Sequence, residues 1–138
     1  TYSLGYSNSY VDMPINHKVF LAQFDAIKKL AERESCVIIG RCADYALEDN
    51  PYAMSIYIKA DMDKRVKRIM TKYQLNESKA SDMIQKEDKR RASYYNYYSS
   101  KKWGDAKSYD LCLDSGKLGV EGSIELIKDF IALREKNF

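Results

Sequence analysis

The sequence predicts an α/β fold in which a parallel β-sheet is flanked by helices. Short apolar runs at residues 36–40, 54–60 and 109–114 have the length of strands, and the first is rich in β-branched residues. Stretches with the apolar periodicity of helices lie between them, and alternating strands and helices are typical of parallel sheets. The run 36–40 is continuously apolar, as expected of a strand covered on both faces.

The 138 residues suit a single domain of ordinary globular composition, with 45% hydrophobic and 31% charged residues. A net charge of +3 is too balanced for binding nucleic acid through net charge alone. No apolar run reaches the roughly 20 residues of a membrane helix, and no signal peptide is recognisable. His17 is expected at the surface, and the cysteines (Cys36, Cys42 and Cys112) are expected to be reduced and buried in a cytoplasmic protein without a bound metal.

The first half of the chain starts with a polar, tyrosine-containing lead-in at residues 1–10 that we expect to be loosely ordered. Asp12 and Pro14 are signals for a helix start, so an amphipathic helix is predicted from about residue 14 to residue 34. Strand 36–40 follows, and a short helix is expected over residues 43–47 before Asn50-Pro51 breaks the chain.

The second half repeats the alternation. Asp61 is expected to cap a helix over residues 62–73, and Asn76 to open a longer helix that extends to at least Tyr94. Trp103-Gly104 marks its end. The remaining predicted elements are strands 54–60 and 109–114, a glycine-bearing loop at 115–122 and a terminal helix at 123–134.

Charged side chains gather where the predicted strands end, which is where parallel sheets bind ligands. Arg41 follows the first strand, with Asp44 shortly after it, and a phosphate is a natural partner for such a guanidinium. An internal Arg41–Asp44 salt bridge is the alternative. Arg65 and Arg68 lie on the helix after the second strand and are placed to reach a ligand, although basic residues on a helix are usually just solvated.

The long helix carries charge on its inner face. At about 100° per residue, one stripe contains Ala80, Ile84, Asp88, Arg91 and Tyr95. A solvated helix keeps its charges on the opposite face, so Asp88 and Arg91 are directed toward whatever the helix covers. The alternative is a local Asp88–Arg91 pair, worth only about 0.3 kcal/mol.

Two other features have competing interpretations. The aromatic cluster at the end of this helix (Tyr94, Tyr95, Tyr97, Tyr98 and Trp103) could stack nucleic-acid bases, but such residues more often pack a helix end against the core. Residues 115–118 resemble the end of a phosphate-binding loop. The pattern GxxxxGK[ST] fails there, because Leu111 and Leu118 stand at two required positions.

Together these segments resemble the cytidylate kinase-like family of nucleoside monophosphate kinases over about residues 14–135. The segments that carry the resemblance are CVIIGRCADYAL (36–47), SIYIKADMDKRVKRIM (55–70), IQKEDKRRASYYNYY (84–98), WG (103–104) and YDLCLDSGKLG (109–119). It implies a three-layer P-loop kinase fold with a lid-like helical region at 76–104, and transfer of the γ-phosphoryl group of ATP, with Mg²⁺, to CMP or a similar nucleotide.

The resemblance also implies roles for individual residues. Arg41 would hold the phosphate of the acceptor nucleotide. Asp88 and Arg91 match the D-x-x-R of the lid helix, which reaches the acceptor nucleotide and the phosphates. Arg68, Arg90 and Arg91 would close over the transferring group, with Arg65 and Asp44 as further substrate contacts; Asp44 matches less well, because Cys42 and Ala43 separate it from the Gly-Arg pair.

The resemblance further implies that the chain is incomplete at its N-terminus. Members of the family begin with a strand, a glycine-rich phosphate loop and a helix, and these residues contain none of them. That strand lies between the equivalents of 36–40 and 55–59, so both are expected to have unpaired inner edges. The chain alone is therefore expected to lack phosphotransferase activity, and a non-catalytic module that binds RNA or protein is the competing hypothesis.

Overall fold

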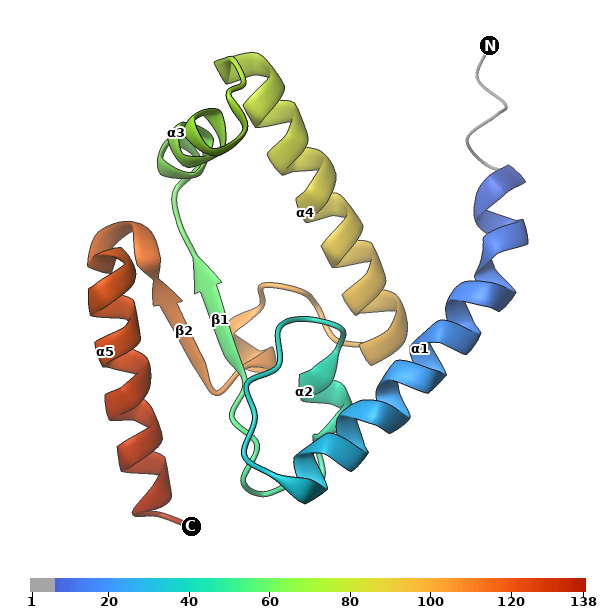
Figure 1. Ribbon diagram of the computed structural model, residues 1–138, viewed down its shortest axis with the longest axis vertical. Coiled ribbons are helices and arrows are strands. Elements are labelled where there is room, and N and C mark those ends of the chain that lie inside the picture. The colour runs from blue at the N-terminus through green and yellow to red at the C-terminus, as the bar shows by residue number, and fades with distance from the viewer. Residues whose placement is uncertain (1–6) are drawn as a thin grey trace. The chain divides into compact units, whose positions relative to one another are not determined.

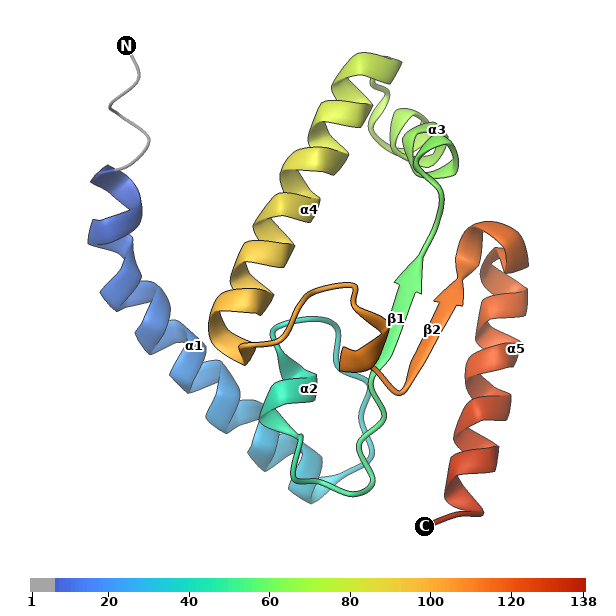
Figure 2. The same cartoon turned by 180° about the vertical axis from the view of Figure 1, so that it is seen from behind.

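The computed structural model describes residues 7–138, with the backbone alone for residues 7–16. The chain forms two compact units, the first ending at Asn50 and the second running over Pro51–Phe138. The helices and strands are mapped on the chain in Figure 1 and seen from behind in Figure 2. Among the described residues they are α1 (Ser7–Arg33), α2 (Ala43–Ala46), β1 (Ile56–Lys59), α3 (Met62–Tyr73), α4 (Glu77–Ser99), a 3₁₀ turn (Ala106–Ser108), β2 (Leu111–Asp114) and α5 (Ser115–Glu135).

The first unit consists of α1, α2 and the segment between them. Helix α1 begins at Ser7 rather than near Pro14, so the expected lead-in is wrong for residues 7–10, while residues 1–6 lie outside the described part. The Phe24 ring packs against Tyr45, with 5.8 Å between ring centroids, and the phenyl ring of Phe20 is buried beside it.

Residues 36–40 do not form the predicted strand. The segment has no regular secondary structure and pairs with no described residue. Its side chains are not covered either, since Val37 is 94% exposed and Ile39 is 90% exposed. An apolar, β-branched sequence favours extended backbone, but a strand also requires a neighbour for its N–H and C=O groups.

The sheet of the second unit contains β1 and β2, which are parallel as predicted. Ile56 is opposite Leu111 and Lys59 is opposite Asp114, so both strands end on the same side. At their start, the carboxylate of Asp110 accepts a 2.8 Å hydrogen bond from the Ser55 amide. The architecture is thus a helix-dominated α/β fold with a small parallel sheet, and the three-layer P-loop arrangement remains a prediction.

Helices α3 and α4 are joined by a short turn and pack against each other, with bounds close to those predicted, and we call them the α3–α4 hairpin. In Figures 1 and 2, α3 is seen nearly along its axis while α4 lies across the view. The core of the hairpin consists of Val66, Ala80 and Ile84, packed against Ile69, Met70 and Leu75. Asn76 caps α4 by accepting a 2.9 Å hydrogen bond from the amide of Lys79. The amphipathic periodicity of both segments therefore determines which faces meet.

Helix α5 packs against both strands and begins earlier than expected. The predicted loop at 115–122 is wrong, because the helix starts at Ser115 and is interrupted only at Gly119 (φ 71°). The Asp114 side chain accepts hydrogen bonds from the amides of Gly116 and Lys117, and such capping stabilises a helix start despite the glycines.

Candidate functional site

A cationic groove of about 530 Å³ lies between α3 and α4 in the second unit. Its lining combines apolar side chains with four basic ones and one acidic one. The lining residues are Arg65, Arg68, Ile69, Lys72, Tyr73, Met83, Ile84, Glu87 and Arg91.

Helical periodicity places the basic side chains on this groove. Arg65, Arg68 and Lys72 are three and four residues apart on α3, so they share one face of that helix. Arg91 lies two turns beyond Ile84 on α4, which places it beyond the apolar core. Arg68 and Arg91 therefore line the same groove, and Arg41, the third guanidinium group expected at one phosphate site, is not among its lining residues.

Two of these guanidinium groups are held by no ion pair, although the negative charge of Glu87, which lines the same groove, attracts Arg91. Neither Arg68 nor Arg91 makes an ion pair or a side-chain hydrogen bond within the described part of the chain. Unpaired guanidinium groups that face one groove repel each other, and an anion placed between them removes that repulsion. Phosphate oxygens suit this arrangement, because guanidinium binds them in a bidentate manner.

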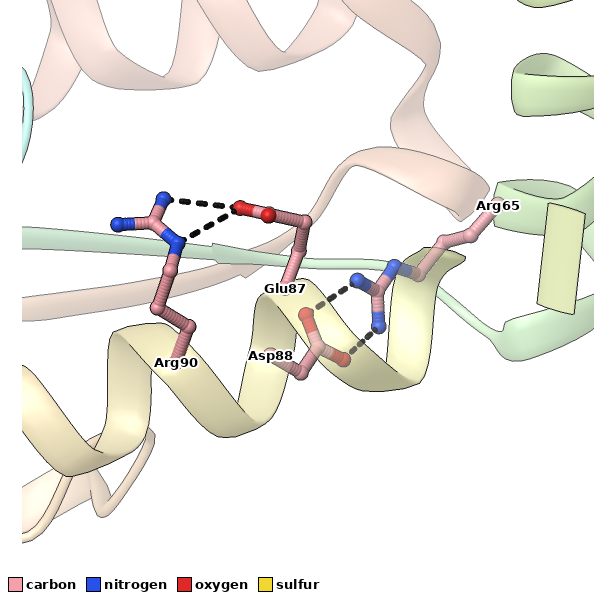
Figure 3. A network of polar contacts seen from close by, with 4 residues as sticks. All are labelled: Arg65, Glu87, Asp88 and Arg90. Atoms are coloured by element: carbon pink, nitrogen blue, oxygen red, sulfur yellow. Dashed lines mark hydrogen bonds and ion pairs between the residues drawn. The ribbon is translucent and has the colours of Figure 1, made fainter. Parts of the chain in front are cut away.

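Arg65 of α3 is paired with Asp88 of α4, as Figure 3 shows. Two guanidinium nitrogens donate hydrogen bonds of 2.6 and 2.7 Å to the two carboxylate oxygens. These hydrogen bonds are the main reason that the pKa of Arg65 is raised. The alternative of a local Asp88–Arg91 pair is wrong, because the Asp88 carboxylate is engaged by the other helix.

Arg90 pairs locally with Glu87, one turn earlier on α4 (Figure 3). It donates hydrogen bonds of 2.8 and 3.1 Å to one carboxylate oxygen, and they lower the pKa of Glu87. The Arg90 side chain is 61% exposed and does not line the groove. For Arg90 to close over a phosphoryl group, as expected, its ion pair with Glu87 would have to break.

Arg41 and Asp44 belong to the first unit. Arg41 is exposed, has a positive φ of 57° and makes no ion pair within the described residues, so the alternative of an Arg41–Asp44 salt bridge is not formed. Asp44 lies in the first turn of α2. That Arg41 acts on the same ligand as Arg68 and Arg91 stays a prediction.

The cysteines differ from the expectation that all are buried. Cys36 and Cys112 are exposed and Cys42 is buried, and all three are free thiols. Burial raises the pKa of the Cys42 thiol to about 11, and the negative charge of Asp44 adds to the shift. The reactive thiolate of Cys42 is therefore scarce until the pH approaches this value.

We expect iodoacetamide at pH 8 to modify Cys36 and Cys112 while Cys42 stays largely unmodified. The increase in pKa from 9.0 to about 11 lowers the Cys42 thiolate fraction about 100-fold. Peptide mass spectrometry over a time course measures the three rates, and the denatured chain, in which all three should react alike, is the control. Equal rates for Cys42 and Cys36 in the folded chain would contradict the burial of Cys42.

The aromatic cluster packs the end of α4 rather than forming an open stacking surface. Tyr95 is buried and stacks on Tyr109 with 6.0 Å between ring centroids. Tyr57 of β1 stacks on Tyr109 and meets Trp103 edge to face. Tyr97 remains exposed.

Sequence reasoning missed some residues of the groove. Lys72 could have been found by extending the periodicity of Arg65 and Arg68 by one turn, whereas nothing in the local sequence points to Tyr73 or Met83. Tyr57 was also missed. Burial is the main cause of its raised pKa, followed by the negative charge of Asp88.

The segment at 115–118 does not offer free amides to a phosphate. Asp114 accepts hydrogen bonds from the amides of Gly116 and Lys117, and the Lys64 side chain donates to the Gly116 carbonyl. The described residues also contain no group of three His, Cys, Asp or Glu side chains able to hold a metal. Within the same part of the chain, no helix has the length and apolar character needed to span a membrane.

Comparisons with known proteins agree with this architecture. The model of the cytidylate kinase-like family matches residues 1–117. A solved structure, of an uncharacterized protein from Eubacterium ventriosum ATCC 27560, is 40% identical with a TM-score of 0.80. The match covers 83% of this chain and 65% of that chain, so the chain spans less than two thirds of the length of this structural relative. No curated protein matches this chain. Because the family match extends over most of its residues, the chain belongs to the cytidylate kinase-like family.

Proposed function

We propose that these residues form the acceptor-nucleotide and lid part of a cytoplasmic kinase that transfers a phosphoryl group from ATP to CMP or a similar nucleotide. Membership of the cytidylate kinase-like family supports the reaction class. The observation that carries the proposal is the presence of Arg68 and Arg91, neither in an ion pair within the described residues, on one groove.

The proposed mechanism is positioning combined with charge neutralisation. Phosphoryl transfer spreads negative charge over the equatorial oxygens of the transferring group, and guanidinium groups stabilise that charge. Arg41 holds the acceptor phosphate and Asp44 is a further substrate contact, while Arg68 on α3 and Arg91 on the lid helix α4 bind the phosphates. Arg90 joins them once it has left Glu87, and closure of the α3–α4 hairpin excludes water.

ATP would bring Mg²⁺ with it as the ion bound to its phosphates. The pattern GxxxxGK[ST] is absent from these 138 residues, so they offer no loop of backbone amides and lysine for the ATP phosphates. We therefore expect no turnover of ATP and CMP by this chain alone in a coupled assay.

Calorimetric titration of the chain with CMP tests the proposal. We expect saturable binding that weakens about tenfold in Arg41→Gln, because a charge-assisted hydrogen bond contributes about 1.5 kcal/mol or more. A single-stranded RNA of about 15 nucleotides is titrated in parallel at several salt concentrations. No CMP binding, together with RNA binding that falls steeply with salt, would instead identify the chain as a nucleic-acid-binding module.

A further inference from the structure

The Arg65–Asp88 ion pair is part of a row of contacts that join α3 to α4. The row begins at Leu75 beside the connecting turn and continues through the apolar core of Val66, Ala80 and Ile84. Arg65 precedes Val66 on α3, and Asp88 follows Ile84 by one turn on α4. The ion pair therefore extends the interface beyond the apolar core, away from the turn.

Both oxygens of Asp88 are occupied by this contact. Each oxygen accepts a hydrogen bond from one terminal nitrogen of Arg65, at 2.6 and 2.7 Å. The Asp88 side chain is only 24% exposed and the Arg65 side chain 31%. This bidentate geometry restricts the relative orientation of two helices more than a single contact does. Figure 3 shows the Asp88 carboxylate facing the Arg65 guanidinium.

The two guanidinium groups that form no ion pair among the described residues flank this one. Arg68 is one turn beyond Arg65 on α3, and Arg91 is three residues beyond Asp88 on α4. The distance between the helices at the ion pair thus determines how far apart these guanidinium groups are held. A direct contact between the Asp88 carboxylate and a phosphate would in addition be repulsive.

We propose that Asp88 and Arg65 are positioning residues whose ion pair holds α3 against α4 so that Arg68 and Arg91 face one anion. Asp88 then acts on the anion through Arg65, which engages both of its carboxylate oxygens. The identification of that anion as a nucleotide phosphate rests on the proposed function, whereas the positioning itself does not. This role differs from the nucleotide contact that the family resemblance implies for Asp88.

The proposal makes a prediction that is opposite in sign to simple electrostatics. Asp88→Asn removes a negative charge beside a cationic groove and frees Arg65, so charge alone would strengthen anion binding. If the ion pair positions Arg68 and Arg91, the same substitution instead weakens binding of pyrophosphate about tenfold. Calorimetric titration with pyrophosphate at constant ionic strength measures the difference.

A variant with the two charges exchanged provides a second test of the positioning role. The double variant Arg65→Asp/Asp88→Arg restores an ion pair between the helices, and we expect pyrophosphate affinity within about threefold of the original chain. Asp82→Asn, an equal charge change at an exposed position of α4, is the matched control and should leave affinity within about twofold. Tighter binding in Asp88→Asn, or a double variant as weak as Asp88→Asn, overturns the proposal.

Hydrogen exchange separates this proposal from the proposed function. In Asp88→Asn the amides of α3 around Arg65 should exchange faster, and the double variant should restore their protection. If no variant binds CMP or pyrophosphate but exchange follows this pattern, the ion pair holds the helices together and the proposed function is wrong. If exchange is the same in all variants, the positioning role is wrong.

Discussion

Replacing Ile84 with alanine is expected to lower the free energy of unfolding by about 3 kcal/mol. The Ile84 side chain is buried between Val66 and Ala80, which make up the core of the α3–α4 hairpin. Truncation removes buried methyl and methylene groups and leaves a cavity that two tightly packed helices cannot close completely. Urea unfolding followed by circular dichroism measures the loss.

Met83 provides the matched control, because it precedes Ile84 on the same helix and is 39% exposed, against 4% for Ile84. Met83→Ala should cost less than about 1 kcal/mol, since a partly exposed side chain loses little buried area. Similar losses in the two variants would show that the hairpin core does not depend on Ile84.

The second large effect is expected at the groove. Substituting both Arg68 and Arg91 with glutamine should weaken pyrophosphate binding about 100-fold, with about tenfold from each position. Each guanidinium group is available to an anion, because neither is in an ion pair among the described residues. Titration calorimetry at low and moderate salt measures both the loss and the reduced salt dependence.

Lys67→Gln is the control for charge. Lys67 is on α3, directly before Arg68, but it is exposed and does not line the groove. It should change pyrophosphate affinity less than threefold. An equal loss in Lys67→Gln would mean that the anion responds to overall charge and that the groove is not its site.

The helices and the two paired strands could be predicted from sequence because their signals are local. The periodicity of residues 62–73 and 76–94, with asparagine at the start of α4, is sufficient to place the hairpin. Residues 36–40 carry an equally clear pattern but form no strand. Strand formation depends on a partner for the backbone, and the apolar run itself contains no information about that partner.

The candidate site shows the same distinction. Helical geometry predicted that Ile84 and Arg91 lie on one stripe of α4, and both residues line the groove. Helical geometry did not identify the partner of Asp88. It offered a local pair with Arg91 or an unidentified ligand, whereas the actual partner, Arg65, is on another helix. Contacts between elements depend on how the helices pack, and the charge pattern of one helix does not determine this.

The exposed run at Cys36–Gly40 also has a consequence for handling the protein. Val37 and Ile39 project into solvent, and no described residue forms a ladder with this backbone. Such a stretch is a template for edge-to-edge association of copies, and it has the low charge typical of aggregation-prone segments. Concentrated preparations are therefore at risk of precipitating, and a lysine at one of these two positions is the natural means of keeping the polypeptide dispersed.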